Sequence, residues 1–229
     1  MTKGLGVIIV AAGASHRMLG ADKVFSPILG IPLLAYAVET FDRSTLVDRI
    51  VVVVRSDAIE ETRTLAESRH WRKVTRIIPG GDRRQDSVQA GLQTLGDCAW
   101  VAVHDGARPC VTDAVLERGL EAARETGAAI AAVPAKDTIK VTDAGGIVTR
   151  TLPRASLRLV QTPQIFRYAL ITQAYAQSDT EVTDDAALVE EAGHRVKTFM
   201  GAYENIKVTT PEDLILAELF LRQRMGAST

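Results

Sequence analysis

Two cations in a loop of small residues are the part of this sequence best suited to chemistry. Arg17 and Lys23 belong to a segment that begins Ala11, Ala12, Gly13, Ala14 and follows a strand-like run, Gly6–Val10. Small residues let a loop close around a bulky anion, and N–H groups in a tight turn attract negative charge. A guanidinium grips phosphate oxygens in pairs, and an ammonium adds a mobile point charge. The pattern favours a polyphosphate site, although an ordinary strand-to-helix turn with two surface cations has it too.

Polar loops follow three more of the expected strands. The segment from Pro79 to Ser87 follows the third strand, His104 to Pro109 follows the fourth, and Lys136 to Thr138 follows the fifth. Because ligands of open α/β sheets bind beyond the carboxyl ends of the strands, these loops should converge on one edge with the first. Their convergence carries more weight than any single loop.

Single residues in these loops allow more than one interpretation. Gly80 and Gly81 would let the backbone approach a flat ring, to which Ser87 could donate; Asp82 could equally cap a helix. Asp105 ends a buried strand, where a carboxylate needs a partner. That partner could be a metal ion, a ribose hydroxyl or Arg108. We interpret the neighbouring His104 as structural rather than catalytic.

Short apolar runs alternate with helical patterns in the elements that must position these loops. Apolar positions recur at three and four residues in the helical stretches, and the strand runs are rich in Val and Ile. Strands are expected at Gly6–Val10, Ile50–Val54, Val74–Ile78, Ala99–Val103 and Ala128–Val133, and helices at Leu33–Phe41, Ala58–Arg69, Asp86–Leu95 and Asp113–Thr126. This rhythm predicts an α/β fold with a mostly parallel sheet and helices on both faces.

The pattern changes after the fifth strand. Ile139–Val141 and Ile147–Thr151 flank a turn at 143–146 and are typical of a hairpin. We expect an arm over about residues 136–160 within a single domain of residues 1–229, and a second subunit is the simplest surface for it to pack on. A loose surface hairpin is the alternative. Helices at Arg167–Gln177, Thr183–Ala192 and Pro211–Arg224 and a strand at Arg195–Met200 should complete the chain.

Composition excludes several classes of protein. The 229 residues carry a net charge of −1, so no global basic field attracts nucleic acid. No apolar run approaches the roughly 20 residues of a membrane span. Cys98 and Cys110 have neither a disulfide framework nor metal-ligand spacing, which favours reduced thiols in a cytoplasmic protein. The G-x-x-x-x-G-K-[ST] motif is absent, which argues against a P-loop NTPase.

Taken together, these segments resemble the 2-C-methyl-D-erythritol 4-phosphate cytidylyltransferases of the non-mevalonate isoprenoid pathway. The likeness spans nearly the whole chain, and its most specific parts are HDGAR at 104–108 and GG-x-x-R-x-x-SV at 80–88. The family usually has Pro-Lys-Gln around the loop lysine, where this chain has Asp22-Lys23-Val24. It usually has a second loop glycine where this chain has Ser15, and His16 stands at a position that is often basic or small.

The resemblance implies a Rossmann-like, three-layer homodimer with interlocking β-arms. It implies transfer of CMP from CTP to methylerythritol phosphate with Mg²⁺, held mainly by the CTP phosphates and near Asp105. By matching positions, the phosphates of CTP would meet Arg17, Lys23 and Lys207. Asp105 would lie by the ribose, and cytosine would be held by Gly81, Asp82, Ser87 and the backbone of Ala11, Ala12, Gly13 and Ala14. Methylerythritol phosphate would be held by Arg108, Thr138, Arg154, Thr162 and Thr183, some of them from the partner subunit.

Three other functions remain as alternatives. A ribitol- or glycerol-phosphate cytidylyltransferase would share the fold and the triphosphate chemistry. A sugar-nucleotide or molybdopterin transferase would share the first loop, but the arm and Thr162-Pro163-Gln164 argue against it. A nucleotide-binding module that has lost catalysis is disfavoured because Arg17, Lys23, Asp105 and Lys207 are all present.

Overall fold

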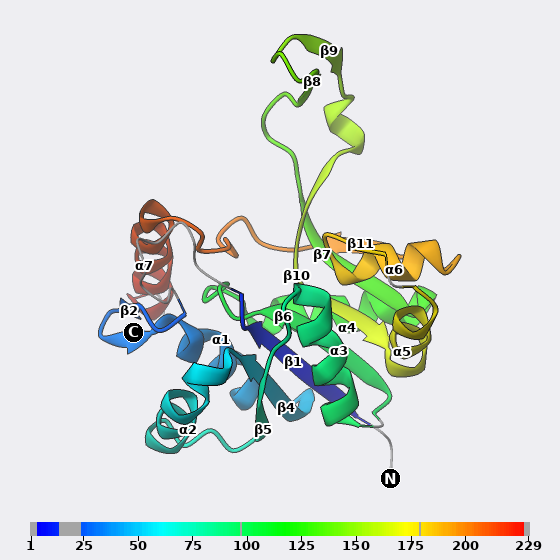
Figure 1. Ribbon diagram of the computed structural model, residues 1–229. Helices are drawn as coiled ribbons and strands as arrows, with labels where there is room; N and C mark the ends of the chain where they lie inside the picture. The colour runs from blue at the N-terminus through cyan, green and yellow to red at the C-terminus, as the bar shows by residue number, and fades with distance from the viewer. Residues whose placement is uncertain (1–3, 14–23, 97, 179, 227–229) are drawn as a thin grey trace.

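The computed structural model describes residues 4–13, 24–96, 98–178 and 180–226 (Figure 1). Ala14, Arg17 and Lys23 fall outside these ranges, so their expected roles stay predictions. The sequence departures at Ser15, His16 and Asp22 fall there too.

A central sheet of seven strands organises the described residues. Its order is β11-β7-β10-β6-β1-β4-β5. The strands are β1 Leu5–Ala11, β4 Val47–Val54, β5 Val74–Pro79, β6 Trp100–Asp105, β7 Ala128–Pro134, β10 Arg158–Arg167 and β11 Lys197–Met200. Strand β10 runs antiparallel to both β6 and β7, and the other neighbouring pairs are parallel. The mostly parallel sheet is therefore confirmed.

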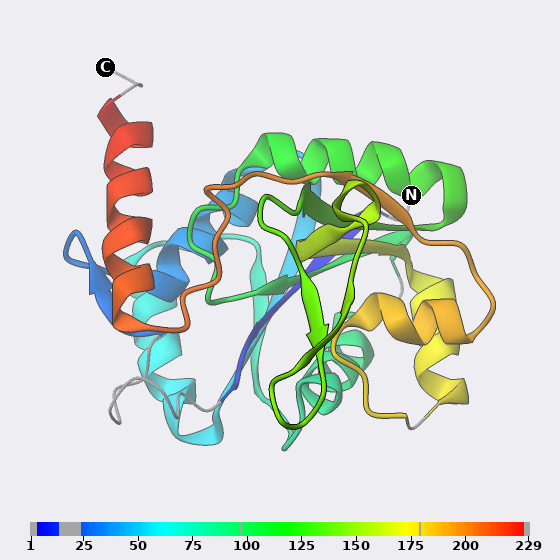
Figure 2. The same cartoon turned by 90° about the horizontal axis from the view of Figure 1, so that it is seen from above.

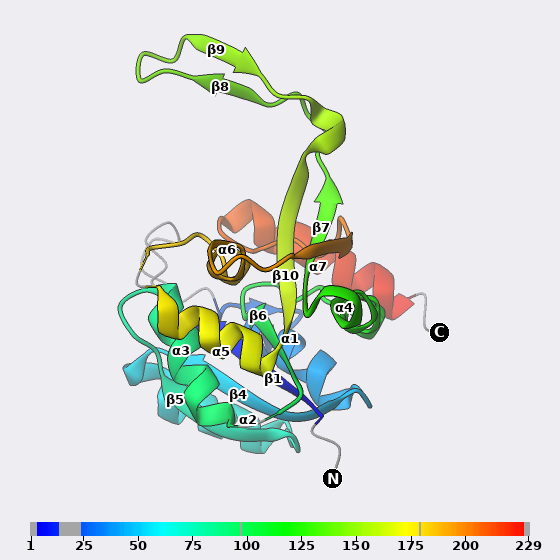
Figure 3. The same cartoon turned by 90° about the vertical axis from the view of Figure 1, so that its right-hand side faces the viewer.

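Helices cover both faces of the sheet and make a three-layer molecule (Figures 1 and 3). One face carries α3 Arg84–Leu95, α5 Tyr168–Gln177 and α6 Asp185–Glu191. The other face carries α1 Leu33–Arg43, α2 Ile59–Ser68 and α4 Asp113–Thr126, with α7 Pro211–Gly226 packed outside α1. Two very short strands, β2 Pro27–Ile28 and β3 Ile31–Pro32, and the 3-10 turns Ser56–Ala58 and Arg154–Ser156 lie between these elements.

The central strands alternate between two hydrophobic cores. On β4, Ile50, Val52 and Val54 enter the core beneath α1 and α4, whereas Val51 and Val53 enter the core beneath α3 and α5. A strand covered on both faces has no polar side, which explains its almost pure valine sequence. All five of these side chains are 0% exposed.

Strand β10 is the strand of the central sheet that sequence analysis does not predict. It occupies Arg158–Arg167, where we expected the end of the arm and then, from Arg167, a helix; the helix begins at Tyr168. Pro163 lies inside the strand, and proline cannot donate to a ladder. The strand accommodates it because pairing with β7 is irregular between Val160 and Gln164.

The predicted hairpin is present and projects from the body. Strands β8 Lys140–Thr142 and β9 Val148–Thr151 pair antiparallel, and their turn is closed by the Asp143 carboxylate, which accepts N–H groups of Gly145 and Ile147. Figure 3 shows the hairpin turning away from a stem that continues β7 and β10, and Figure 2 looks down on it. At the base of the arm, Lys136 lies 3.6 Å from the ring centroid of Tyr203.

Candidate functional site

Two cavities meet beyond the carboxyl ends of β1 and β6. The first, of about 370 Å³, lies between the end of β1 and the loop before α3. The second, of about 280 Å³, lies between the end of β6, β10 and the segment before α6. Arg84, Asp105 and Lys207 line both cavities. The predicted convergence of loops is therefore found for every loop that the structure describes except the one after β7.

The walls of the first cavity are backbone and small side chains. Its lining includes Ala11, Ala12 and Gly13 on one side and Gly81, Asp82 and Ser87 on the other. A Cβ on Gly80 would lie 2.3 Å from Ala12 Cβ and 2.6 Å from Ser87 Oγ, so glycine lets the two loops close against each other. Because the two loops are in close contact, this wall of the cavity is formed by backbone and small side chains, against which a planar ring could pack.

Helix α3 begins without the cap that Asp82 could have supplied. Its first residue is Arg84, two residues earlier than predicted, and the carboxylate of Asp86 accepts the N–H of Arg83 at 3.0 Å. Ser87 Oγ accepts the N–H of Gly81 at 3.2 Å. Asp82 is thus left to line the cavity.

Asp105 lies where the two cavities join, and three cations surround it. Its side chain is 9% exposed. Lys207 Nζ lies 3.0 Å from Oδ2, Arg108 Nε lies 3.4 Å from the same oxygen, and Arg84 Nε lies 3.4 Å from Oδ1. Of the partners considered for this carboxylate, Arg108 is present, and it shares Asp105 with two further cations.

The cations keep Asp105 ionised. Burial alone would raise the pKa of this carboxyl, but Lys207, Arg84 and Arg108 outweigh burial and hold the pKa well below its usual range. Burial alone would lower the pKa of Arg84, but Asp185 and Asp105 raise it above its ordinary value. Three cations against these two carboxylates leave one positive charge in this group of five, and Asp82 and Asp184 also line the cavities.

Beneath Asp105, a buried imidazole fixes the end of β6. His104 is 0% exposed, and its Nε2 lies 3.2 Å from the carbonyl oxygen of Arg108. A carbonyl only accepts, so Nε2 carries the proton and Nδ1 accepts from the hydroxyl of Thr162 at 3.1 Å. The same hydroxyl accepts the N–H of Asp105 at 3.0 Å. Burial lowers the pKa of His104 to about 4, which keeps it neutral and supports a structural role.

Lys207 is brought to the site by the segment before α7. Arg108 Nη1 donates to the carbonyl of Asn205 at 2.8 Å, and Asn205 Nδ2 donates to the carbonyl of Thr162 at 2.8 Å. Asn205 is 0% exposed, whereas the Lys207 side chain is 39% exposed. The backbone is therefore anchored while the ammonium stays accessible to a ligand.

Two glutamines hold the segment that carries Thr183. Gln85 bonds the backbone at 180–182 through both its amide nitrogen and its oxygen, each at 3.3 Å. Gln164 Nε2 donates to Asp184 at 2.8 Å. Asp184 caps α6, which begins two residues later than predicted, so Thr183 is not the cap. Thr183 instead lines the second cavity.

Comparisons with known proteins agree on one family. The family model for 2-C-methyl-D-erythritol 4-phosphate cytidylyltransferase matches residues 5–223. A protein of that name from Dehalococcoides mccartyi is 47% identical over 97% of this chain and 98% of its own length. The namesake from Geobacter metallireducens is 44% identical over 95% and 97%. The chain belongs to this family.

Solved structures of cytidylyltransferases support the same conclusion. A 4-diphosphocytidyl-2C-methyl-D-erythritol synthase from Anaerococcus prevotii superposes with a TM-score of 0.85 at 32% identity, covering 96% of this chain and 99% of that one. The family's enzyme from Thermus thermophilus gives a TM-score of 0.77 at 32% identity, covering 94% and 98%. The protein is therefore a nucleotidyltransferase.

The arm residues expected at the cytidylyltransferase site lie elsewhere in this chain. Thr138 and Arg154 do not occur among the described residues that line either cavity. Arg154 Nη1 donates to the carbonyl of Lys136 at 2.6 Å, within the arm. Figure 1 shows the arm directed away from the body that holds the cavities.

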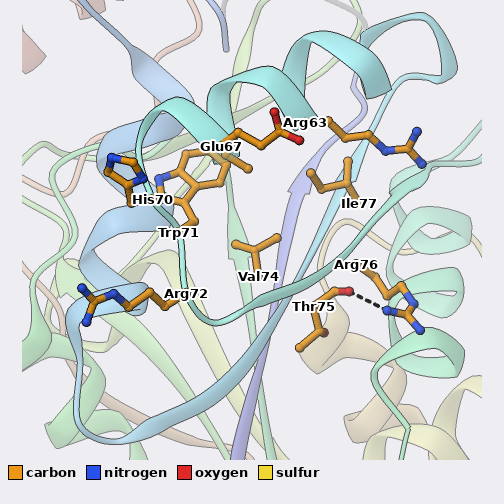
Figure 4. A pocket seen from close by; sticks show the side chains of 10 residues that line it. Arg63, Glu67, His70, Trp71, Arg72, Val74, Thr75, Arg76 and Ile77 are labelled. Carbon is orange, nitrogen blue, oxygen red and sulfur yellow. Dashed lines mark hydrogen bonds between the residues drawn. The ribbon is translucent and has the colours of Figure 1, made fainter.

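A larger cavity of this cytidylyltransferase lies away from both. It measures about 590 Å³ and lies between α2 and β5, at the opposite edge of the sheet from β11 (Figure 4). The residues that line this cavity include Arg63, Arg72 and Arg76, together with Trp71 and Ile77. Among the described residues that line it, none is a buried carboxylate. None of these described residues lies in a loop that comes directly after the carboxyl end of a strand of the central sheet. The candidate active site is therefore chosen by the chemistry of its side chains rather than by cavity volume.

Sequence reasoning assigned no role to Arg84 or Asp185. Arg84 is the arginine of the GG-x-x-R-x-x-SV motif, and this motif was the available signal. Asp185 is 1% exposed and pairs with Arg84 across 101 positions of sequence, so no local pattern marks it. Within the described residues, no helix is long and apolar enough to cross a membrane.

Proposed function

We propose that this enzyme transfers CMP from CTP to 2-C-methyl-D-erythritol 4-phosphate and releases pyrophosphate. The observation that carries the proposal is the meeting of two cavities at one carboxylate, Asp105, which three cations surround. We assign the first cavity to the nucleoside triphosphate and the second to the polyol phosphate. Family membership supplies the identity of both substrates.

The chemistry is a displacement at phosphorus. An oxygen of the acceptor phosphate forms a bond to the α-phosphorus of CTP, and the bond from that phosphorus to the bridging oxygen breaks. Pyrophosphate leaves with the electron pair. The acceptor phosphate is already an anion at neutral pH, so the attack needs no strong base, and the main barrier is repulsion between two anions. Positioning and charge neutralisation therefore carry catalysis.

Cations at the boundary between the cavities would reduce that repulsion. Lys207 reaches both cavities, and its exposed ammonium can turn from Asp105 towards a phosphate. Arg108 lines the second cavity, where the acceptor phosphate would lie. We assign Arg17 and Lys23 to the triphosphate from the first loop. Turnover like that of the wild type in folded Arg17→Ala or Lys23→Ala variants would remove them from this role.

One end of the first cavity would hold cytosine. Gly81 and Asp82 line it together with the backbone of Ala11 to Gly13, which supports recognition of a base edge. Ser87 Oγ already holds the N–H of Gly81, so it would act mainly by fixing that loop. Asp105 would then lie near the ribose. Thr162, whose hydroxyl is used by His104 and Asp105, would fix Asp105 rather than bind the acceptor directly.

A divalent cation, Mg²⁺ in the first instance, is part of the proposal. Within the described residues, no group of three His, Cys, Asp or Glu side chains could hold a metal. Mg²⁺ commonly uses substrate phosphates and one or two carboxylates rather than an all-protein cage. Asp105 is the carboxylate placed to assist, and bound Mg²⁺ would supply further positive charge to the triphosphate.

We propose that the active enzyme is a homodimer formed through the arm. Apolar side chains on the arm and its stem are exposed: Ile147 by 67%, Val148 by 53%, Leu159 by 49% and Val160 by 41%. Burying such side chains against a second copy would be favourable. A partner's arm could then bring Thr138 and Arg154 to the second cavity.

The cytoplasm is the proposed location, because Cys98 and Cys110 are both buried and are thiols rather than a disulfide pair. The test of function is pyrophosphate release with each of the four nucleoside triphosphates and a panel of polyol phosphates. We expect activity with CTP and methylerythritol phosphate above all other pairs. A preference for ribitol or glycerol phosphate would refute the assigned acceptor, and no release with any pair would refute the reaction.

A further inference from the structure

A buried carboxylate outside both cavities holds one of the active-site cations. Asp185, the first residue of α6, is 1% exposed and lines neither cavity among the described residues. Its Oδ2 lies 2.9 Å from Arg84 Nη2, and its Oδ1 accepts from the hydroxyl of Tyr175 at 2.6 Å. Both oxygens are therefore engaged, each by a specific partner.

Arg84 spans the distance between this carboxylate and the site. Its Nη2 bonds Asp185 while its Nε lies 3.4 Å from Oδ1 of Asp105. A guanidinium is planar and rigid, so fixing one nitrogen fixes the direction of the others. The remaining oxygen of Asp105, Oδ2, is held by Arg108 and Lys207. Arg84 thereby connects Asp185 to the Asp105 carboxylate.

Helix capping does not explain Asp185. Asp184 accepts an N–H at the start of α6, and Gln164 Oε1 accepts the N–H of Ala186 at 3.2 Å. The start of the helix is therefore satisfied without Asp185, whose contacts go to Arg84 and Tyr175 instead. A buried carboxylate is costly unless paired, which makes its placement here significant.

We propose that Asp185, oriented by Tyr175, is a positioning residue for nucleotidyl transfer. It holds Arg84 at the boundary between the cavities, so that Arg84 keeps Asp105 correctly turned when the two phosphates approach. This inference rests on the proposed function. Without Asp185, the guanidinium would be free to bind the triphosphate in other geometries, and misplacement by about 1 Å costs on the order of a hundredfold in rate.

The first test removes single hydrogen-bonding groups. Asp185→Asn should lower kcat about a hundredfold and Tyr175→Phe about tenfold, with KM for CTP changing less than about threefold. Tyr168→Phe is the matched control, because Tyr168 lies on the same helix and its hydroxyl donates to the Leu92 carbonyl at 2.8 Å. Equal kinetics for the two tyrosine variants, or a loss confined to KM for CTP, would overturn the proposal.

The second test asks whether Asp185 acts through Arg84. Asp185→Asn should add less than about twofold to the loss of kcat in an Arg84→Met background, because the interaction is already absent. The double variant should also be more stable than Arg84→Met alone, which leaves a buried carboxylate unpaired. A full additional hundredfold loss in the double variant would show that Asp185 acts independently, and it would refute the inference.

Measuring the activity of the wild-type enzyme distinguishes a failure of the proposed reaction from a failure of the role proposed for Asp185. An inactive wild-type enzyme would refute the proposed reaction, and the inference with it. An active wild type with a normal Asp185→Asn variant would refute the inference alone.

Discussion

Acid should destabilise this enzyme in a pH range set by His104. The ordinary pKa of histidine is 6.5, and burial lowers that of His104 to about 4. Between these values the unfolded chain holds a proton that the native state lacks. Stability must therefore fall as the pH falls through this window, and the contribution of neutral His104 is fully present only above about pH 6.5.

The size of the effect follows from the two pKa values. The linkage relation gives a loss on the order of 1 kcal/mol at pH 5.5 and roughly 2 to 3 kcal/mol at pH 4.5, relative to pH 7.5. Asp105 has a pKa shifted downwards, so its contribution is lost only as the pH falls below about 3.9, the unfolded value for aspartate. The two groups therefore act in different pH ranges.

Urea unfolding followed by circular dichroism near pH 7.5, 5.5 and 4.5 measures this loss. His104→Asn keeps an acceptor for the Thr162 hydroxyl and cannot titrate, so its stability should decline by roughly 2 to 3 kcal/mol less than that of the wild type. His70→Asn is the control: His70 is exposed at the surface and has a φ of 55°, which asparagine tolerates. The same decline in His104→Asn as in the wild type would refute the reasoning.

Three further predictions concern the site and its loops. Lys207→Met should lower kcat by about 10² to 10³, and unchanged turnover in a folded variant would exclude Lys207 from charge stabilisation. Arg154→Ala should weaken binding of methylerythritol phosphate with little change for CTP, and calorimetry with the reverse pattern would contradict the assignment. Gly80→Ala should lower the free energy of unfolding by about 1–3 kcal/mol, because its Cβ would lie 2.3 Å from Ala12 Cβ. Gly13→Ala, which has open space at that position, should be nearly neutral, and equal losses would contradict the packing argument.

Elements buried on both faces were predictable because their patterns are local. The valine run of β4 and the small-residue end of β1 identify themselves within a few residues, and their position in a parallel sheet follows. Strand β10 was not predictable in the same way. Its first three residues are exposed, Pro163 interrupts it, and its antiparallel place between β6 and β7 depends on partners far away in sequence.

The same distinction applies to the site. Asp105 could be singled out because a carboxylate at the end of a buried strand needs partners. Arg83 and Arg84 are adjacent and chemically identical in sequence, yet Arg83 pairs with Asp86 on the surface and Arg84 with Asp105 and Asp185. Only the fold decides which of the two pairs with the buried carboxylates.

Strand β10 connects three parts of the enzyme within ten consecutive residues. Arg158 lies at the stem of the arm, Thr162 lies under Asp105, and Gln164 holds the segment that carries Thr183. Insertions at the hairpin tip, near residues 143–146, would leave this alignment intact. Loss of one residue between 157 and 161 would instead shift the register of the strand segment that leads into Thr162 and Gln164. Changes in the length of the arm should therefore be tolerated best at the hairpin tip.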